Sequence, residues 1–205
     1  MKKFVTSILV SIMTMTTVSA KNIPLPAPEI KGGMPVLEAI DHRASAVGDS
    51  FPSGDVSNQE LATLLWAASG RNRQDKGWVV PTAMGKAPYA VIYVIGKKGV
   101  FRYNGKEHTL SQISDKDIRQ SISPQNFVSS VPYSLVFVID GVGVNVPADV
   151  GSTLVGAMSQ NIYLASQALN IGVRYMTSMK ADVVRKELDL NETELPLAIM
   201  SFGHY

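Results

Sequence analysis

Residues 149–169 read DVGSTLVGAMSQNIYLASQAL, and this long apolar segment decides the fold class. Its apolar residues recur at the three- and four-residue spacing of an α-helix, and Leu164 and Ala168 widen the apolar stripe. A helix that is apolar around most of its circumference is expected inside the protein, packed between other elements. The main stripe consists of Leu154, Ala157, Met158, Ile162, Ala165 and Leu169.

Continuous apolar runs before this helix predict buried strands. YAVIYVI at 89–95 and YSLVFVI at 133–139 are rich in β-branched and aromatic residues, as buried strands are. VFRYNGKEHTL at 100–110 predicts a hairpin with Asn104-Gly105 at its tip. Because helices and strands are interleaved and a hairpin is also present, we expect an α+β fold with a mixed central β-sheet flanked by helices. Further strands are expected at 172–177 and 195–202.

Two capping patterns predict where other helices begin. Ser57 and Glu60 have the spacing of a capping box, in which each side chain bonds the backbone amide of the other residue. The apolar spacing that follows predicts a helix that ends at Gly70. Ser114 and Asp117 form a similar pair and predict another, shorter helix.

The chain of 205 residues is expected to contain a leader, an arm and one domain. Residues 1–20 combine a basic start, a short apolar run and the small residues of Val18-Ser19-Ala20, which predicts a signal peptide cleaved near Ala20. Residues 21–33, rich in Pro and Gly, predict an extended N-terminal arm, either lying across a partner subunit or disordered. Residues 34–205 form the domain. The expected protein is periplasmic or secreted and has no stable membrane anchor, the alternative being an uncleaved amphipathic anchor.

The composition excludes several classes of function. The sequence has no cysteine, which excludes disulfides, thiol catalysis and a lipoprotein anchor. Without Lys2 and Lys3 of the leader, 17 basic residues face 17 acidic ones, so no nucleic-acid partner is expected. The sequence lacks G-x-S-x-G, H-E-x-x-H, G-x-x-x-x-G-K-[ST] and G-x-G-x-x-G, and its three histidines lack the spacing of metal ligands. No metal site is therefore predicted.

A short basic and hydroxylic stretch, AIDHRASAVG at 39–48, follows the first expected helix at 34–43. Arg43 can bind a phosphate bidentately, and Ser45 can add a hydroxyl donor, so the pair is a candidate anion site. The alternative interpretation is a solvated helix end with Arg43 near the last carbonyl groups. A His42–Ser45 hydrolase pair is a remote third interpretation. The apolar residues of this helix that share a face are Val36, Leu37 and Ile40.

Two further segments carry candidate binding groups. Gln160 and Asn161 interrupt the apolar helix, and their amides must find partners, either in a structural network or in a ligand or neighbouring subunit. WVVPTAMGKAP at 78–88 combines Pro, Gly and small residues before a strand, which allows a flat ligand to approach the backbone.

Taken in order, these stretches resemble the nitroreductase superfamily, specifically its SagB-type or thiazole/oxazole-dehydrogenase-like branch. The resemblance covers nearly all of residues 34–205 and depends on the order of several motifs. These motifs are MPVLEAIDHRAS, LATLLWAASGRNR, VVPTAMGKAPYAVIYVI, GVFRYNGKEHTL, DKDIRQSISPQNFVSSVPYSLVFVID, GAMSQNIYLASQALNIGVRYMTS and AIMSFGHY.

The resemblance implies an α+β homodimer with FMN at the subunit interface. It implies a flavin cycle in which NAD(P)H is a possible electron donor and a nitroaromatic, quinone or similar small molecule is the second substrate. Within the R-x-S motif, Arg43, Ala44 and Ser45 match the residues that hold the FMN phosphate and ribityl chain. The remaining cofactor-binding positions are Pro81, Thr82 and Ala83 along the flavin ring, and the backbone of Arg174 and Tyr175 near the flavin N5. No catalytic side chain is assigned.

Among the positions that depart from the family pattern, three favour a different function. Val47 stands where the family commonly has a second basic residue, and Gly85 stands where it has Asn. Tyr175 replaces a small residue. These departures favour an alternative function, a flavin-less binding or scaffold protein in the periplasm with the same fold.

Overall fold

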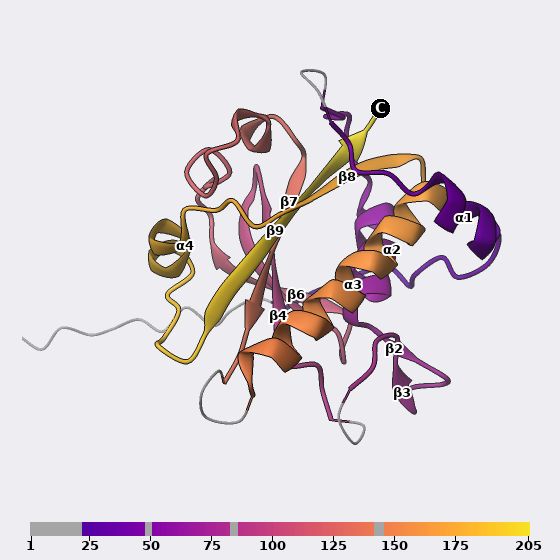
Figure 1. Cartoon of the computed structure of the whole chain (residues 1–205), viewed down its shortest axis with the longest axis horizontal. Coiled ribbons are helices and arrows are strands. Elements are labelled where there is room, and N and C mark those ends of the chain that lie inside the picture. Colours follow the sequence, from indigo (N-terminus) through magenta and orange to yellow (C-terminus); the bar gives the residue numbers. More distant parts are fainter. Residues whose placement is uncertain (1–21, 48–50, 83–85, 142–145) are drawn as a thin grey trace, which may run out of the picture.

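The computed structural model describes residues 22–47, 51–82, 86–141 and 146–205. Its centre is a seven-stranded sheet with the strand order β1-β6-β5-β4-β7-β9-β8, and helices lie on both sides of it (Figure 1). The sheet strands are β1 (Asn22–Pro24), β4 (Ala90–Gly96), β5 (Gly99–Asn104), β6 (Thr109–Ser114), β7 (Tyr133–Ile139), β8 (Ile171–Met176) and β9 (Leu195–His204). The helices are α1 (Val36–His42), α2 (Asn58–Ser69), α3 (Ala148–Ala168) and α4 (Ala181–Glu187), and β2 (Arg71–Asn72) and β3 (Gly77–Trp78) form a small separate ribbon.

The α+β class and the expected strands are confirmed, but the prediction of a mixed sheet is wrong. Every neighbouring pair of described strands in the sheet is antiparallel. The segment β7–α3–β8 has the strand–helix–strand order of a parallel unit, and that order suggested parallel pairing. The C-terminal strand β9 lies between β7 and β8 and pairs antiparallel with both.

The sheet buries an apolar core on each face. On one face, Leu64 of α2 and Met158 of α3 are fully buried together with Phe137 of the sheet. On the other face, Val184 of α4 is buried against Val136. Each fully buried side chain of this size contributes about 1.5–3 kcal/mol relative to an exposed one.

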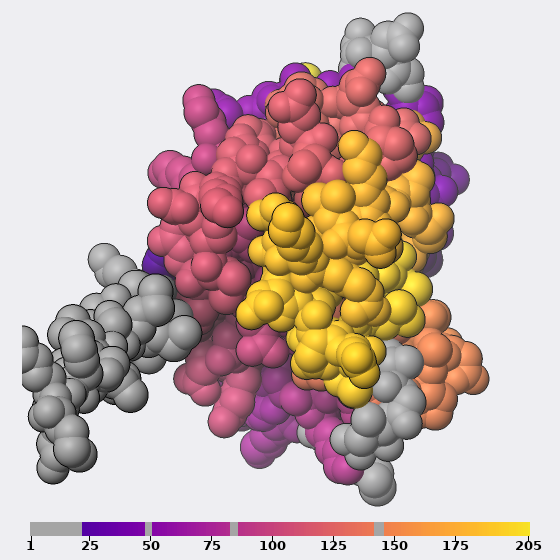
Figure 2. Space-filling view, turned by 90° about the vertical axis from the view of Figure 1, so that its left-hand side faces the viewer, coloured from indigo at the N-terminus to yellow at the C-terminus, as the bar shows by residue number. Residues whose placement is uncertain are grey.

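The second face is covered by two segments that are far apart in sequence. Residues 115–131 and the chain around α4 lie side by side, and Figure 2 shows them in salmon and yellow. The Lys180 amide donates to the Ile122 carbonyl at 2.9 Å, and the Ser123 hydroxyl donates to the Ser178 carbonyl at 3.1 Å. The two segments therefore form one cover over this face.

The short helix expected from Ser114 and Asp117 does not form. The Ser114 hydroxyl accepts from the Lys116 amide, and Asp117 binds both the backbone and the guanidinium of Arg119. These local side-chain bonds stabilise turns in competition with a helix. The one helical turn in this part of the described chain is a 3-10 helix at Asn126–Ser129.

The long helix α3 is less enclosed than its composition suggests. Its buried stripe includes Leu154, Met158 and Ile162, as expected. Gly156 and Gln160, however, are exposed. Figure 1 shows α3 lying across one face of the sheet beside α1 and α2. Small and polar residues on its outer side allow that side to remain open within one chain.

The N-terminal arm packs on its own chain. Strand β1 pairs with β6, and the Gln59 side-chain amide donates to the Ala27 backbone carbonyl at 2.7 Å. The Glu29 amide donates to the Thr63 hydroxyl at 3.1 Å, and the His108 ring lies 2.9 Å from the Pro26 carbonyl oxygen. The described part of the arm is thus an edge strand followed by an extended strap over α2.

The predicted capping box at the start of α2 is confirmed, and it sets a stability expectation. The Ser57 hydroxyl accepts from the Glu60 amide at 3.2 Å, and the Glu60 carboxylate accepts from the Ser57 amide at 2.8 Å. Ser57→Ala should lower the free energy of unfolding by about 1 kcal/mol, the usual cost of losing such a cap. Urea unfolding monitored by circular dichroism measures this change. Ser53→Ala, at an exposed position that caps no helix, should leave the free energy of unfolding unchanged. Equal stabilities for the two variants would contradict the role given to Ser57.

His108 gives the arm a pH dependence. Burial lowers the pKa of His108 below its usual 6.5, and the bond to the Pro26 carbonyl offsets part of this effect. The folded protein therefore binds this proton less readily than the unfolded chain, so stability should decline as pH falls below about 6.5. His108→Asn removes the titration, and Asn tolerates the positive φ of 52° at this position. The free energy of unfolding of wild type minus that of the variant, measured by urea unfolding, should become less positive or more negative from neutral to mildly acidic pH. A constant difference would rule out this contribution.

Candidate functional site

Tyr163 joins the two halves of the predicted cofactor site. It projects from α3 and is buried, and its hydroxyl lies 2.8 Å from the Ser45 hydroxyl, just beyond α1. The Tyr175 backbone amide, on β8, donates to the same Tyr163 hydroxyl at 2.9 Å. One phenol therefore connects the R-x-S segment to the strand that the resemblance placed near the flavin.

Arg43 lies beside this phenol. Its guanidinium carbon is 5.1 Å from the centre of the Tyr163 ring, within the range of a cation–π contact. The side chain is half-buried, and no described carboxylate is within salt-bridge distance of it. Ala44 is exposed between Arg43 and Ser45. The site thus offers a cation and a hydroxyl group on one short extended segment.

The backbone holds this segment in place from both ends. The Arg43 amide donates to the Ala39 carbonyl at 3.0 Å, which ends α1. Three residues later, the Ala46 amide donates to the Val173 carbonyl at 2.8 Å, which attaches the segment to the free edge of β8. The solvated helix end considered from sequence is therefore a docked segment.

The two residues expected near the flavin N5 point in opposite directions. Tyr175 packs against the core on the α3 side, and burial together with the neighbouring Tyr163 raises the pKa of its phenol, so it stays neutral at physiological pH. Arg174 lies over the ring of Phe127, 5.5 Å from its centre, and Phe127 in turn stacks on Phe51. Only Tyr175 takes part in the cluster around Tyr163.

No hydrogen bond among the described residues joins Pro81 or Thr82 to this cluster. The chain that leads to them follows β3, and the Asn161 side-chain amide of α3 donates to its Val79 carbonyl at 3.4 Å and to the Ala67 carbonyl of α2 at 3.0 Å. In Figure 1, β3 lies below α3, whereas α1 lies beside the upper end of α3. Pro81 is exposed and Thr82 is half-buried. Ala83 and Gly85 lie outside the described residues.

The structure decides between the alternatives left open for several polar groups. Asn161 satisfies backbone carbonyl groups of its own chain, which confirms the structural-network interpretation for it, while Gln160 is exposed. The Ser45 hydroxyl bonds Tyr163, which gives no support to a His42–Ser45 pair. No group of potential metal ligands occurs among the described residues.

Sequence reasoning missed Tyr163 as a site residue. The stretch GAMSQNIYLASQALNIGVRYMTS contains it, but no sequence pattern gave Tyr163 a role of its own. A signal was present, because a buried tyrosine hydroxyl needs a hydrogen-bond partner. The polar candidates that could supply one were Ser45 and the free edge of a strand.

This arrangement of a central antiparallel sheet, a long helix across one face and an R-x-S segment docked on the edge strand defines a class of α+β oxidoreductase folds. A sequence profile of the nitroreductase family matches residues 50–204, and the chain belongs to the nitroreductase family. The resemblance inferred from the motifs is confirmed at the level of the family. A comparison with proteins of curated function gave no match.

Solved structures show the same fold. A candidate nitroreductase from Ralstonia eutropha has 26% sequence identity and a TM-score of 0.80, with 97% of this chain and 95% of that chain covered. A candidate nitroreductase from Anabaena variabilis has 18% identity and a TM-score of 0.71, with 96% of this chain and 45% of that chain covered. The E. coli microcin synthetase McbBCD complex contains a chain with 14% identity and a TM-score of 0.63, with 99% of this chain and 84% of that chain covered. Separately, none of the helices in the described part of the chain is long and apolar enough to cross a membrane.

Proposed function

We propose that this nitroreductase-family protein is an FMN-dependent oxidoreductase that transfers hydride to or from a small organic substrate. The observation that carries the proposal is the cluster around Tyr163, in which the Ser45 hydroxyl and the Tyr175 amide share one phenol. It places the half-buried Arg43, which has no described acidic partner, beside a strand edge. A guanidinium and a hydroxyl group in this arrangement suit a phosphate.

The residues present fit the phosphate end of FMN, and the contacts expected around its ring are less complete. Arg43 and Ser45 would hold the phosphate and ribityl chain, and Pro81 and Thr82 would lie along the ring. Val47 is 72% exposed and supplies no second cation. The Tyr175 amide already donates to Tyr163, so that phenol would have to release the amide before it could serve the flavin N5. Bound FMN would supply the hydride chemistry, because its isoalloxazine ring accepts and releases hydride.

The same proposal includes a homodimer. The apolar side chains that share one face of α1 are exposed within one chain. A two-fold pairing that covers α1 would bury this face. The exposed fractions are 62% for Val36, 77% for Leu37 and 52% for Ile40.

The electron donor and the cell compartment complete the proposal. NAD(P)H is the proposed donor, and a nitroaromatic or quinone is the proposed class of acceptor. Residues 1–20, which lie outside the described residues, are proposed to be a signal peptide that directs the protein to the periplasm or medium. Mass spectrometry of the protein expressed with its leader would then show a mature chain that begins at Lys21.

The visible spectrum of the purified protein tests flavin binding. A yellow protein that releases FMN on denaturation, and whose colour bleaches with NAD(P)H, supports the proposal. Val47 and the occupied Tyr175 amide favour the second candidate, a flavin-less binding or scaffold protein with this fold. A colourless protein that binds no added FMN would establish that second candidate instead.

A further inference from the structure

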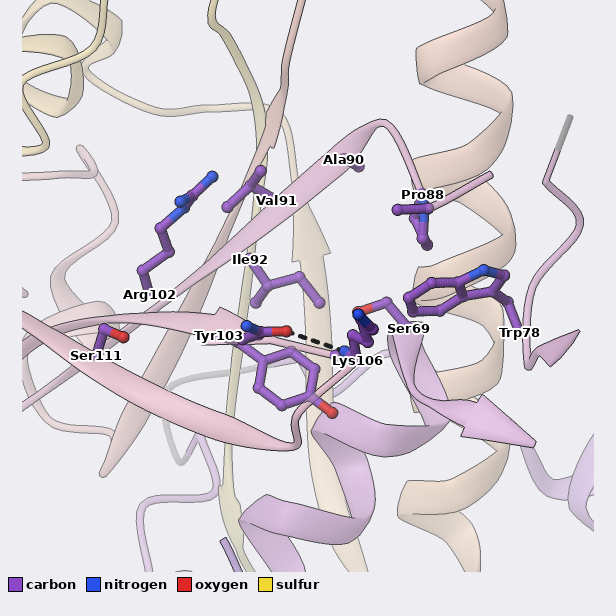
Figure 3. A pocket seen from close by; sticks show the side chains of 13 residues that line it. Ser69, Trp78, Pro88, Ala90, Val91, Ile92, Arg102, Tyr103, Lys106 and Ser111 are labelled. Atoms are coloured by element: carbon purple, nitrogen blue, oxygen red, sulfur yellow. Dashed lines mark hydrogen bonds between the residues drawn. The ribbon is translucent and has the colours of Figure 1, made fainter. Parts of the chain in front are cut away.

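The central sheet contains a fork between two neighbouring strands. β4 and β5 pair only from Tyr93 and Arg102 to Gly96 and Gly99. Beyond this ladder, Ala90–Ile92 of β4 and Tyr103–Asn104 of β5 continue as strands without pairing with each other. Figure 3 shows the two strands separating, with Val91 and Arg102 projecting to one side and Lys106 and Trp78 lying on the other. The edge of β4 that faces the fork therefore has no β5 partner there.

A cavity of about 360 Å³ occupies this fork. That volume lies within the usual range for small-molecule sites, near its lower end. Ser69, at the end of α2, lies against the β5–β6 turn, where Gly105 leaves no room for a side chain beside the Ser69 carbonyl. Ile92 and Pro88 supply apolar walls. The fork is thus a built cavity with a floor and walls.

The charged side chains that line the cavity are all cationic. Arg102 and Lys106 are the ionisable cations of the lining, and the lining contains no carboxylate. Lys106 has a weak contact to Glu107 at 3.8 Å, and both of these side chains are mostly exposed. A cavity with this lining favours an anion.

Trp78 gives the cavity an unused hydrogen-bond donor. The residue is 8% exposed, and its indole nitrogen is buried with no hydrogen-bond partner among the described residues. Figure 3 shows the indole reaching in among the lining side chains, with its nitrogen on the edge toward Pro88. The other tryptophan of the chain is satisfied, because the Trp66 indole donates to the Arg71 carbonyl at 2.7 Å. A buried donor without a partner costs free energy, which a ligand acceptor would recover.

We infer that this cavity, formed by Trp78, Pro88, Ile92, Arg102 and Lys106, binds a small planar carboxylate such as an aromatic acid. The carboxylate accepts from the Trp78 indole and is stabilised by Lys106, while Ile92 and Pro88 contact the ring. Arg102 pairs with Tyr93 and projects to the other face of the sheet, so it adds positive charge at the far mouth of the cavity and no direct contact. A carboxylate suits Trp78 and Lys106 because it combines acceptors for the indole with a charge that matches the ammonium group. An aromatic ring of modest size suits a volume of about 360 Å³.

This site goes beyond the proposed flavin function and does not depend on it. Trp78 precedes Pro81 and Thr82 by a few residues, so a bound acid would lie near the start of the segment proposed to contact the flavin ring. The acid site itself uses only groups of the fork. Its test can therefore be run on protein without FMN, and failure of flavin binding would leave the result unchanged.

Isothermal titration of the flavin-free protein with benzoate tests the proposal. Benzoate should bind saturably, and benzamide, which has the same shape without the charge, should bind at least about tenfold more weakly. Trp78→Phe keeps an aromatic ring, removes the donor and should weaken benzoate binding about tenfold. In Trp66→Phe, where Trp78 is the one remaining tryptophan, benzoate should change the fluorescence with the same affinity.

A charge-matched pair of variants separates the cavity from the net charge of the protein. Lys106→Gln should weaken benzoate binding about tenfold and leave benzamide binding unchanged. Lys98→Gln removes the same charge at the opposite end of the β4–β5 hairpin and should leave both affinities unchanged. Both side chains are on exposed residues, so these variants should fold. No saturable binding of benzoate, equal affinity for benzamide, or equal effects of the two variants would overturn the proposal.

Discussion

Arg43→Ala is expected to weaken FMN binding by about 1.5–3 kcal/mol, which corresponds to a factor of roughly 10 to 150 in the dissociation constant. The guanidinium lies over the Tyr163 ring and has no described acidic partner, so its charge is available for a phosphate. A hydrogen bond between charged groups has this magnitude when one partner is removed. Arg43→Lys should recover only part of the affinity, because an ammonium group cannot bond two phosphate oxygens at once as a planar guanidinium does.

Fluorescence quenching of FMN on titration with flavin-free protein measures this effect. Lys116→Ala is the matched control, because it removes one exposed cation from the segment over the other face of the sheet and should leave the dissociation constant unchanged. Riboflavin, which lacks the phosphate, should bind wild type and Arg43→Ala with similar affinity. An Arg43→Ala protein that binds FMN as tightly as wild type would refute the assignment of Arg43 as the phosphate anchor.

Local sequence signals predicted the elements well because each element satisfies its own physical requirement. Tyr133–Ile139 is a continuous apolar run and is a strand covered on both faces. Ser57 and Glu60 satisfy each other at the start of α2, which needs no information from the rest of the chain. Ser114 and Asp117 failed as a helix start because Asp117 binds Arg119, and the spacing of a capping pair does not register such a competing partner.

Properties that depend on distant parts of the chain could not be predicted in the same way. The antiparallel sheet results from the insertion of β9 between β7 and β8, and no local pattern in either strand encodes that position. The apolar face of α1 has the periodicity of a core helix, yet Leu37 is 77% exposed. Periodicity indicates that a face should be buried, but it does not say whether the cover comes from the same chain or from another copy.

The candidate site combines both kinds of information. Arg43 and Ser45 were candidates from the sequence because their chemistry suits an anion, and the resemblance to the family favoured this interpretation over a solvated helix end. Tyr163 was missed because its role depends on two contacts to remote residues, Ser45 and Tyr175. A structure was needed to show that one hydroxyl group on α3 connects the end of α1 to the edge of β8.

Tyr163→Phe is expected to lower the free energy of unfolding by about 1–3 kcal/mol, because it leaves the Tyr175 amide without its partner next to a buried ring. Chemical unfolding measures this, and Tyr205→Phe, at a side chain that is 79% exposed, should have no effect. Ser45→Ala should lower the free energy of unfolding by less than about 1 kcal/mol. Ser45 is exposed, so the Tyr163 hydroxyl can bond water in its place.

The double variant Tyr163→Phe/Ser45→Ala decides what the phenol does. If Ser45 contributes to stability only through Tyr163, adding Ser45→Ala to Tyr163→Phe should cost nothing further, and the two changes should be non-additive. The same cycle measured on FMN affinity has a different expectation. Ser45 would touch the phosphate directly, whereas Tyr163 would act by positioning the segment, so Ser45→Ala should still weaken FMN binding in the Tyr163→Phe background. Additive stability effects together with no effect of either change on FMN affinity would place the cluster outside the cofactor site and leave it as a structural link between α1, α3 and β8.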